Sequence, residues 1–408
     1  MDKQKYKKQN NNYNLLEYEY SIPNYIYKNN IIDPEVEYYR LFIINNFFKQ
    51  LEYKIKKKIK RKLVNRERFK FKTYIGQLII SQISLLTYNQ PTEVIYQDSL
   101  IIKPSKEVLL DFYRDLNNLF KNQVLFKYDE LDIISYFNNL YKKIDIFKTK
   151  LISKRDNNPL SKFKKYFNNT EVVFKLNIQS IHTNEITNVF KLHKNVYERM
   201  KIMYSGPYKN FDLYVLCGLI RYEALNSGGN QYVLNLEFKE QARQKYGLNF
   251  ELFASMFNNY YDNFCSLFYD LEKYFGSKGS VFGLKINSGL YFSNPPFVDS
   301  IMTKMYEIIK QFIGPRTMFI ANMPKWEDYS LQDLVDKEKL YHQKWLIYEY
   351  FLNPFTQKAI DIPPNYIYLF VNNDLKNKIL ISNISNFISN FYKDKIFTKK
   401  PSWKYLTK

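Results

Sequence analysis

The chain has 408 residues, 45% of them hydrophobic and 18% aromatic, which is enough for a sizeable buried core in about two or three domains. No apolar run is long enough to span a membrane. Residues 1–14 are rich in lysine and asparagine and lack the apolar stretch of a signal peptide. We therefore expect an intracellular globular protein.

The net charge is +21, from 61 basic and 40 acidic residues, and this suggests a polyanionic partner. Part of the lysine excess can instead reflect a genome bias, because the abundant lysine, asparagine, isoleucine, tyrosine and phenylalanine all have codons rich in adenine and thymine. AT-rich protists and large DNA viruses have such genomes. The expected location is therefore either the cytoplasm, in a viral factory, or the nucleus.

Side chains that commonly bind zinc are few. Cys217 and Cys265, the two cysteines, fall in apolar stretches and are predicted to pack as small hydrophobic groups. The histidines, His182, His193 and His342, lack the spacing of metal ligands. We expect no metal site and no disulfide.

The first part of the chain, residues 1–190, is predicted to be a mainly helical accessory or RNA-binding domain without a catalytic motif. Polar, basic stretches at residues 153–159 and 162–166 suggest exposed connections. Helical periodicity occurs in four segments, Tyr38–Lys62, Thr73–Thr87, Lys106–Phe120 and Ile133–Lys150.

One of these helices carries a run of basic residues from Lys54 to Lys62, continued by further basic residues to Lys72. Four apolar residues share one face of this helix and are expected to seat it on the core, Leu51, Ile55, Ile59 and Leu63. The opposite face can contact RNA phosphates, and the candidate residues are Lys56, Lys60, Arg61 and Arg66. A solvated helix face, a nuclear-import signal and a protein partner are the alternatives.

The second part of the chain alternates helices and strands. Residues 237–246 and 298–312 have helical spacing, residues 258–267 are predicted to be a helix running into a strand, and residues 376–408 are predicted to be a helix with a basic end. Strands are predicted at residues 250–254, 317–321 and 366–371. Such alternation favours an α/β fold with a parallel, doubly wound sheet.

The tetrapeptide Asn294-Pro295-Pro296-Phe297 ends the apolar stretch that begins at Gly289. The amino nitrogen of adenine is a poor nucleophile, so an enzyme must hold it and present a methyl donor in line. The Asn294 side-chain oxygen and the Pro295 carbonyl can each accept one amino hydrogen, the prolines stiffen the turn, and Phe297 offers a ring for the base. The motif indicates an adenine N6-methyltransferase, with a simple proline turn as the alternative.

Several segments around this motif resemble the phosphorylated-CTD-interacting-factor family, over roughly residues 190–375. They are Tyr197–Tyr204, Arg221-Tyr222, Phe250–Asn258, Phe264–Asp270, Tyr274–Gly279, Met323–Trp326, His342 and Tyr366–Val371. The resemblance implies a Rossmann-like S-adenosylmethionine-dependent methyltransferase core at residues 191–375. It also implies N6-methylation of the first transcribed adenosine of capped mRNA. Family members pack a helical domain on the core, so the basic helix is expected to help line a groove for capped RNA.

In a doubly wound sheet the methyl donor is expected to lie across the carboxyl ends of the first strands, near Ser255 and Asn258. Asp270 is the first choice for an acid that holds the ribose hydroxyls and Glu272 is the second, with a pair of solvated loop acids as the alternative. The paired glycines of residues 226–230 allow close backbone approach, with a flexible turn as the alternative. The predicted cofactor set is Gln231, Glu251, Ala254, Ser255, Asn258, Asp270 and Asn294.

The chain also departs from the family pattern. Met256 and Phe257 replace a Pro-Leu pair, and Lys325 replaces an acidic residue before Trp326, which is a candidate substrate contact. The tryptophans lack the spacing of a WW domain, so any transcription or capping partner is not expected to bind through one. A DNA or internal-RNA adenine methyltransferase and an inactive nucleic-acid-binding scaffold are the alternative functions.

Overall fold

The structure is a computed structural model. It describes residues 17–22, 32–89, 104–120, 125–127, 131–152, 158–177, 188–225, 231–325, 330–338, 341–348, 350–355, 358–361, 364–372 and 378–393. In this part of the chain no helix is long and apolar enough to cross a membrane.

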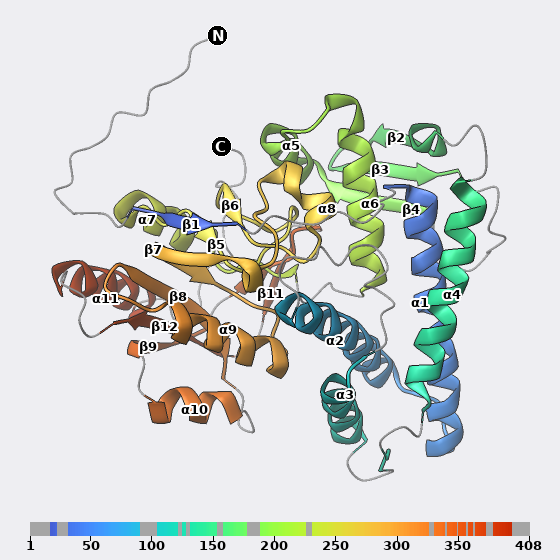
Figure 1. Cartoon of the computed structure of the whole chain (residues 1–408), viewed down its shortest axis with the longest axis horizontal. Helices are drawn as coiled ribbons and strands as arrows, with labels where there is room; N and C mark the ends of the chain where they lie inside the picture. The colour runs from blue at the N-terminus through green and yellow to red at the C-terminus, as the bar shows by residue number, and fades with distance from the viewer. Residues whose placement is uncertain are drawn as a thin grey trace.

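A mixed sheet in the order β6-β5-β7-β8-β12-β9 organises the second half of the chain (Figure 1). The strands from β6 to β8 are parallel, whereas β12 is antiparallel to both β8 and β9. The bounds are β5 (Phe250–Glu251), β6 (Asn263–Phe264), β7 (Lys285–Ser293), β8 (Thr317–Pro324), β9 (Tyr341–Ile347) and β12 (Asn365–Val371). The α/β fold class is confirmed, but a wholly parallel sheet is wrong, because β12 reverses direction.

Helices cover both faces of this sheet. The helices α7 (Leu236–Tyr246) and α11 (Lys378–Lys393) bury apolar side chains on the face that carries Leu290 and Phe292. On the other face, α9 (Asp299–Phe312) and α10 (Ser330–Glu338) pack around Tyr291. Alternate residues of β7 therefore point to opposite cores, which explains why Leu290, Tyr291 and Phe292 are consecutive apolar residues.

The short strand β1 (Glu19–Ser21) pairs antiparallel with the beginning of β7. Beside it, the Tyr18 hydroxyl donates to the Leu290 carbonyl and accepts from the Asn249 amide. Gly289 has a φ of +132°, and a Cβ there would lie 2.7 Å from the Tyr18 ring. Glycine is needed at this position both for the backbone conformation and for the close passage of Tyr18.

The first half of the chain is mainly helical, as predicted. Its helices are α1 (Pro34–Ile59), α2 (Asn65–Asn89), α3 (Lys106–Leu119) and α4 (Ile133–Ile152). The helix α1 begins where the Asp33 side chain accepts from the Glu35 amide at 2.8 Å, with Pro34 in the first turn. It ends at Lys60, which has a left-handed φ of 56°.

A small antiparallel sheet in the order β2-β3-β4 follows these helices. Its strands are β2 (Phe163–Phe167), β3 (Glu171–Leu176) and β4 (Val189–His193). The stretch predicted as a connection at residues 162–166 is thus mostly strand, and that prediction was wrong because β2 is exposed and looks like a loop in its polarity. Residues 153–157 lie outside the described residues.

Shorter elements complete the fold. They are α5 (Lys194–Met203), α6 (Phe211–Ala224), α8 (Tyr269–Glu272), β10 (Tyr350–Leu352), β11 (Ala359–Asp361) and the single-turn helices at Pro159–Lys162, Tyr208–Asn210, Lys273–Phe275 and Val281–Gly283. Residues 258–262 form turns rather than the predicted helix. The side chain of Asn258 explains this, because it accepts from the Ser255 amide and favours a turn over a helix.

The two halves are joined by buried charges. Arg221 of α6 donates to both carboxylate oxygens of Asp270, at 2.8 and 2.9 Å, and also to Glu37 of α1. Arg40 pairs with the same Glu37 at 2.8 Å. These side chains are fully buried, and one apolar cluster continues around them from Tyr38 to beyond residue 190. A domain boundary at residue 190 stays a prediction.

Candidate active site

A pocket lies at the carboxyl ends of the parallel strands. Leu252, Phe253 and Ala254 follow β5, residues 265–267 follow β6, and Asn294 and Pro296 follow β7. Ligands of α/β sheets bind at this edge. The remaining lining comes from α2, α6, α9 and the loops, and consists of Ile80, Ser84, Tyr222, Leu225, Gln231, Asn258, Ser280, Val281, Phe282 and Ile301.

The tetrapeptide after β7 places its residues differently. Asn294 and Pro296 line the pocket, and Pro295 is buried. No hydrogen-bond donor reaches the Pro295 carbonyl among the residues that the structure describes, whereas the Pro296 carbonyl accepts from the Val298 amide at 2.8 Å. Phe297 packs between the apolar clusters on the two faces of the sheet. Its stacking on the base stays a prediction.

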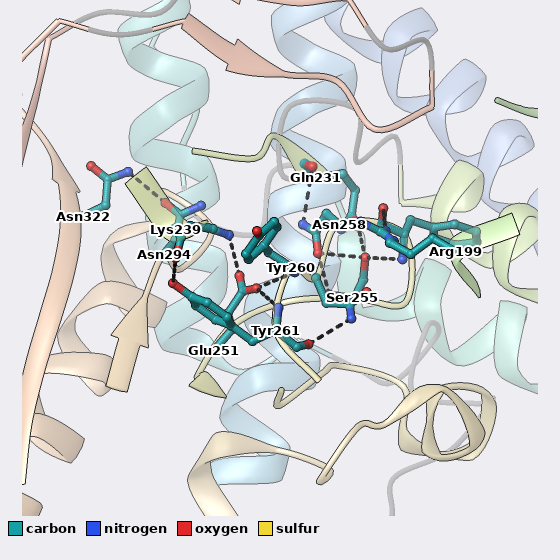
Figure 2. A network of polar contacts seen from close by, with 12 residues as sticks. Arg199, Gln231, Lys239, Glu251, Ser255, Asn258, Tyr260, Tyr261, Asn294 and Asn322 are labelled. Carbon is teal, nitrogen blue, oxygen red and sulfur yellow. Dashed lines mark hydrogen bonds and ion pairs between the residues drawn. The ribbon is translucent and has the colours of Figure 1, made fainter. Parts of the chain in front are cut away.

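Asn294 has a buried partner that the sequence reasoning missed. The Asn322 side-chain nitrogen donates to the Asn294 Oδ1 at 2.8 Å, and Figure 2 shows the two side chains facing each other. Asn322 belongs to β8 and is fully buried. In the sequence, the feature that could have indicated it is a single polar residue inside the apolar run of residues 318–323.

Three predicted cofactor residues, Gln231, Ser255 and Asn258, lie together in one hydrogen-bonded cluster (Figure 2). The hydroxyl of Ser255 donates to Gln231 Oε1, and the Ser255 amide donates to Asn258 Oδ1 at 2.6 Å. The Asn258 side-chain nitrogen reaches the Gln231 carbonyl at 3.4 Å. Ser255 itself is buried behind Gln231 and Asn258, which line the pocket. Their neighbours at residues 226–230 lie outside the described residues.

Glu251 is a buried anchor of the turn that carries these residues. Its carboxylate pairs with Lys239 of α7 at 2.7 Å and accepts from the Tyr260 and Tyr261 amides at 2.5 and 3.1 Å. Figure 2 shows this cluster beside the Ser255 turn. Burial lowers the pKa of Lys239, and Glu251 opposes that shift. Glu251 does not line the pocket, so its contacts give it a supporting place in the site.

The two acids considered for the ribose are both buried. Asp270 has both oxygens occupied by Arg221, and it does not line the pocket. Glu272 accepts from the Met256 and Phe268 amides at 2.8 and 3.0 Å. The structure therefore does not bring either acid to the pocket with Gln231, Ala254, Asn258 and Asn294.

Glu272 gives the fold a dependence on pH. Burial raises its pKa from 4.5 to about 7, against the opposing effect of the two amides. Between these two pH values the folded chain keeps the proton on Glu272, whereas the unfolded chain has lost it. The contribution of this proton to the free energy of unfolding is therefore present at low pH and is lost as the pH rises through about 7. Relative to Glu272→Gln, we expect the wild-type unfolding free energy to fall by about 3 kcal/mol between about pH 5 and pH 8. Urea unfolding at several pH values measures this, and parallel curves for the two proteins would contradict it.

The predicted RNA-contact residues lie away from the pocket. Figure 1 shows the end of α1 on the side of the helical half that is distant from the sheet. Lys56 pairs with Glu52 at 2.6 Å, and Arg61 makes two bonds to Glu67 at 2.7 and 2.6 Å. The seating of this helix is confirmed, because Leu51 and Ile55 are buried and Ile59 and Leu63 pack against the core. Lys60 and Arg66 are exposed, and Trp326 lies outside the described residues.

Comparisons with known proteins address the same region. A family model described as "Phosphorylated CTD interacting factor 1 WW domain" matches residues 191–351, which run from β4 to β10. Residues 191–351 thus match the phosphorylated CTD interacting factor family. This assignment confirms the resemblance found in the sequence, and it covers the strands and turns that form the pocket.

Two curated relatives of the family match as well. A human protein named "mRNA (2'-O-methyladenosine-N(6)-)-methyltransferase" is 28% identical over 153 residues, which are 34% of this chain and 22% of the relative. A mouse protein of the same name matches with the same identity and the same coverage. The aligned part thus spans about a fifth of the length of these family members.

The departure from the family pattern at Met256 has a packing explanation. A Cβ built on Gly218 of α6 would lie 1.8 Å from the Met256 Cε, so the methionine fills the space that the glycine leaves. The ring of Phe257 contacts Tyr222 edge to face, with centroids 5.6 Å apart. Met256 and Phe257 are both buried, and they hold α6 against the turn that carries Ser255.

The two cysteines, Cys217 and Cys265, are free and buried, as predicted.

Proposed function

We propose that the chain is an S-adenosylmethionine-dependent methyltransferase that modifies N6 of adenosine at the first transcribed nucleotide of capped mRNA. The observation that carries this proposal is the position of Asn294, which directly follows β7 and lines a pocket shared with Gln231, Ala254 and Asn258. The chemistry in the names of the human and mouse relatives supports it. The relatives align with 34% of this chain, and methyl transfer to defined RNAs tests the substrate directly.

The residues that line the pocket suit both the methyl donor and the adenine of the substrate. Gln231 and Asn258 supply amide groups for the polar parts of the methyl donor, while Phe253 and Phe282 supply apolar surface for an adenine ring. The two rings contact each other edge to face, with centroids 6.2 Å apart. When bound, S-adenosylmethionine supplies an electrophilic methyl group on a sulfonium. Among the described residues, no group of three His, Cys, Asp or Glu side chains could hold a metal ion.

The residues of this chain then act by holding the nucleophile. Asn294 Oδ1 and the Pro295 carbonyl accept the two hydrogens of the adenine amino group, which fixes the nitrogen and partly localises its lone pair. Gln231 and Asn258 would hold the methyl donor, which would supply the methyl group that this nitrogen takes up. One proton then leaves the nitrogen for solvent, and no side chain needs to be ionised. A base at a single-stranded 5′ end enters the pocket without the cost of leaving a duplex.

The test is transfer of label from radioactive S-adenosylmethionine to a panel of short RNAs. The panel contains capped RNA beginning with adenosine or with 2′-O-methyladenosine, the uncapped forms, capped RNA beginning with guanosine and internal adenosine, and a matched single-stranded DNA. Nucleoside analysis identifies the product as N6-methylated adenosine. We expect label only in capped RNA that begins with an adenosine.

The other outcomes separate the alternatives. Label in every adenosine-containing RNA would replace the proposal with an internal RNA methyltransferase, and label in DNA would replace it with a DNA enzyme. No label with any substrate, together with no binding of S-adenosylmethionine by calorimetry, would favour a nucleic-acid-binding scaffold that keeps the fold.

A further inference from the structure

Asn322 occupies a position that normally calls for an apolar residue. Its neighbours Ala321 and Met323 are fully buried, as Asn322 is. The Oδ1 of Asn322 is buried without a hydrogen-bond partner among the residues that the structure describes. A buried acceptor without a donor reduces stability. Packing in β8 alone therefore does not explain an asparagine here.

The topology of the sheet explains which side chain Asn322 serves. The strands β7 and β8 are parallel, and Ser293 and Ala321 form their last pair. Asn294 and Asn322 are the next residues on the two strands, so their side chains meet at the edge where the pocket lies. The resulting hydrogen bond of 2.8 Å runs from the Asn322 nitrogen to the Asn294 Oδ1. Asn322 itself does not line the pocket.

We propose that Asn322 is a positioning residue that sets which way round the Asn294 amide stands. The oxygen and the nitrogen of a carboxamide have nearly the same size, so sterics alone do not choose between the two orientations. The hydrogen bond from the Asn322 nitrogen favours the orientation in which Oδ1 of Asn294 is held directly after β7. That oxygen has a second lone pair, which remains for a hydrogen of the substrate amino group.

Loss of the donor removes this selection. The Asn294 amide can then rotate so that its NH₂ group faces the substrate amino group. An NH₂ group cannot accept the hydrogens of another amino group, so the substrate nitrogen is no longer held in line with the methyl donor. This inference rests on the proposed function, because it concerns the residue that holds the nitrogen.

The test is a double-mutant cycle on methyl transfer, with Asn294→Ala, Asn322→Ala and the double variant. Asn322→Leu keeps approximately the shape of the side chain but has no donor, and it serves if truncation prevents folding. We expect either Asn322 variant to lower kcat by about 10- to 100-fold, with KM for RNA and Kd for S-adenosylmethionine changed less than about twofold. In the Asn294→Ala background we expect no further loss.

A matched control is Asn365→Ala, which removes another buried asparagine from the same sheet, on β12, without touching the pocket. It should lower the melting temperature and leave kcat unchanged. Two outcomes would overturn the positioning role of Asn322 and leave the proposed function intact. One is a loss of kcat in the double variant equal to the product of the two single losses, and the other is a kcat of Asn322→Leu equal to that of the wild type. A wild-type protein that methylates no adenosine substrate would overturn the proposed function together with it.

Discussion

Replacement of Asn294 by alanine should reduce methyl transfer to adenosine by at least about 100-fold. The reason is that the substitution removes one of the two acceptors that we propose for the amino group, and a fixed polar contact in an active site is commonly worth that much in kcat. Calorimetry should show S-adenosylmethionine binding within about twofold of the wild type, because Gln231 and Asn258 at the other end of the pocket are unchanged. Label transfer to the best RNA of the panel measures the loss.

Two comparisons make this result interpretable. Asn365→Ala should transfer methyl groups at the wild-type rate, which shows that loss of a buried asparagine from the sheet is not itself the cause. A variant of Asn294 that keeps more than about a third of the wild-type rate would show that the tetrapeptide is a structural turn in this chain.

Removal of the charge at Arg221 should destabilise the whole protein. In Arg221→Met, Asp270 would lose the cation that holds both of its oxygens, and Glu37 would keep only Arg40. Breaking a buried ion pair by removing one partner costs about 3–5 kcal/mol, and the two carboxylates would also repel each other. We expect the melting temperature to fall by at least about 6 °C, which corresponds to about 2 °C per kcal/mol for a long chain. Differential scanning calorimetry measures the change.

Arg114→Met is the matched control for this substitution. Arg114 of α3 also joins the helical half to the core, through a bond of 2.9 Å to Asp299 of α9. Its side chain is half exposed, and an exposed pair contributes about 0–1 kcal/mol. If the two variants melted at the same temperature, the buried cluster would not be what holds the halves together.

Much of the fold could be predicted because its signals are local. The helices α1 to α4, α7, α9 and α11 follow the spacing of their apolar residues, and β7, β8 and β12 follow their continuous apolar runs. The direction of β12 could not be predicted, since strand pairing depends on how the chain returns to the sheet. The strand β2 was missed because four of its five residues are exposed, which removes the alternating pattern.

The site likewise contains residues that could be predicted from local motifs and residues that could not. Asn294, Gln231 and Asn258 come from motifs that are continuous in the sequence, and the structure brings them to one pocket. Asp270 was chosen as a loop acid, but its partner Arg221 is 49 residues away along the chain, and the sequence does not show that the two meet. Asn322 and the contribution of α2 to the pocket are likewise contacts between distant segments.

Because α2 lines part of the pocket, ligand binding is coupled to the contact between the two halves of the chain. Ile80 and Ser84 come from the helical half, while Asn294 and Phe253 come from the sheet half. A ligand in the pocket touches both, so its binding free energy adds to the contacts that hold the halves together. Ligand binding and the packing of the two halves are therefore thermodynamically linked. A ligand bound in the pocket stabilises the contact between the two halves of the chain.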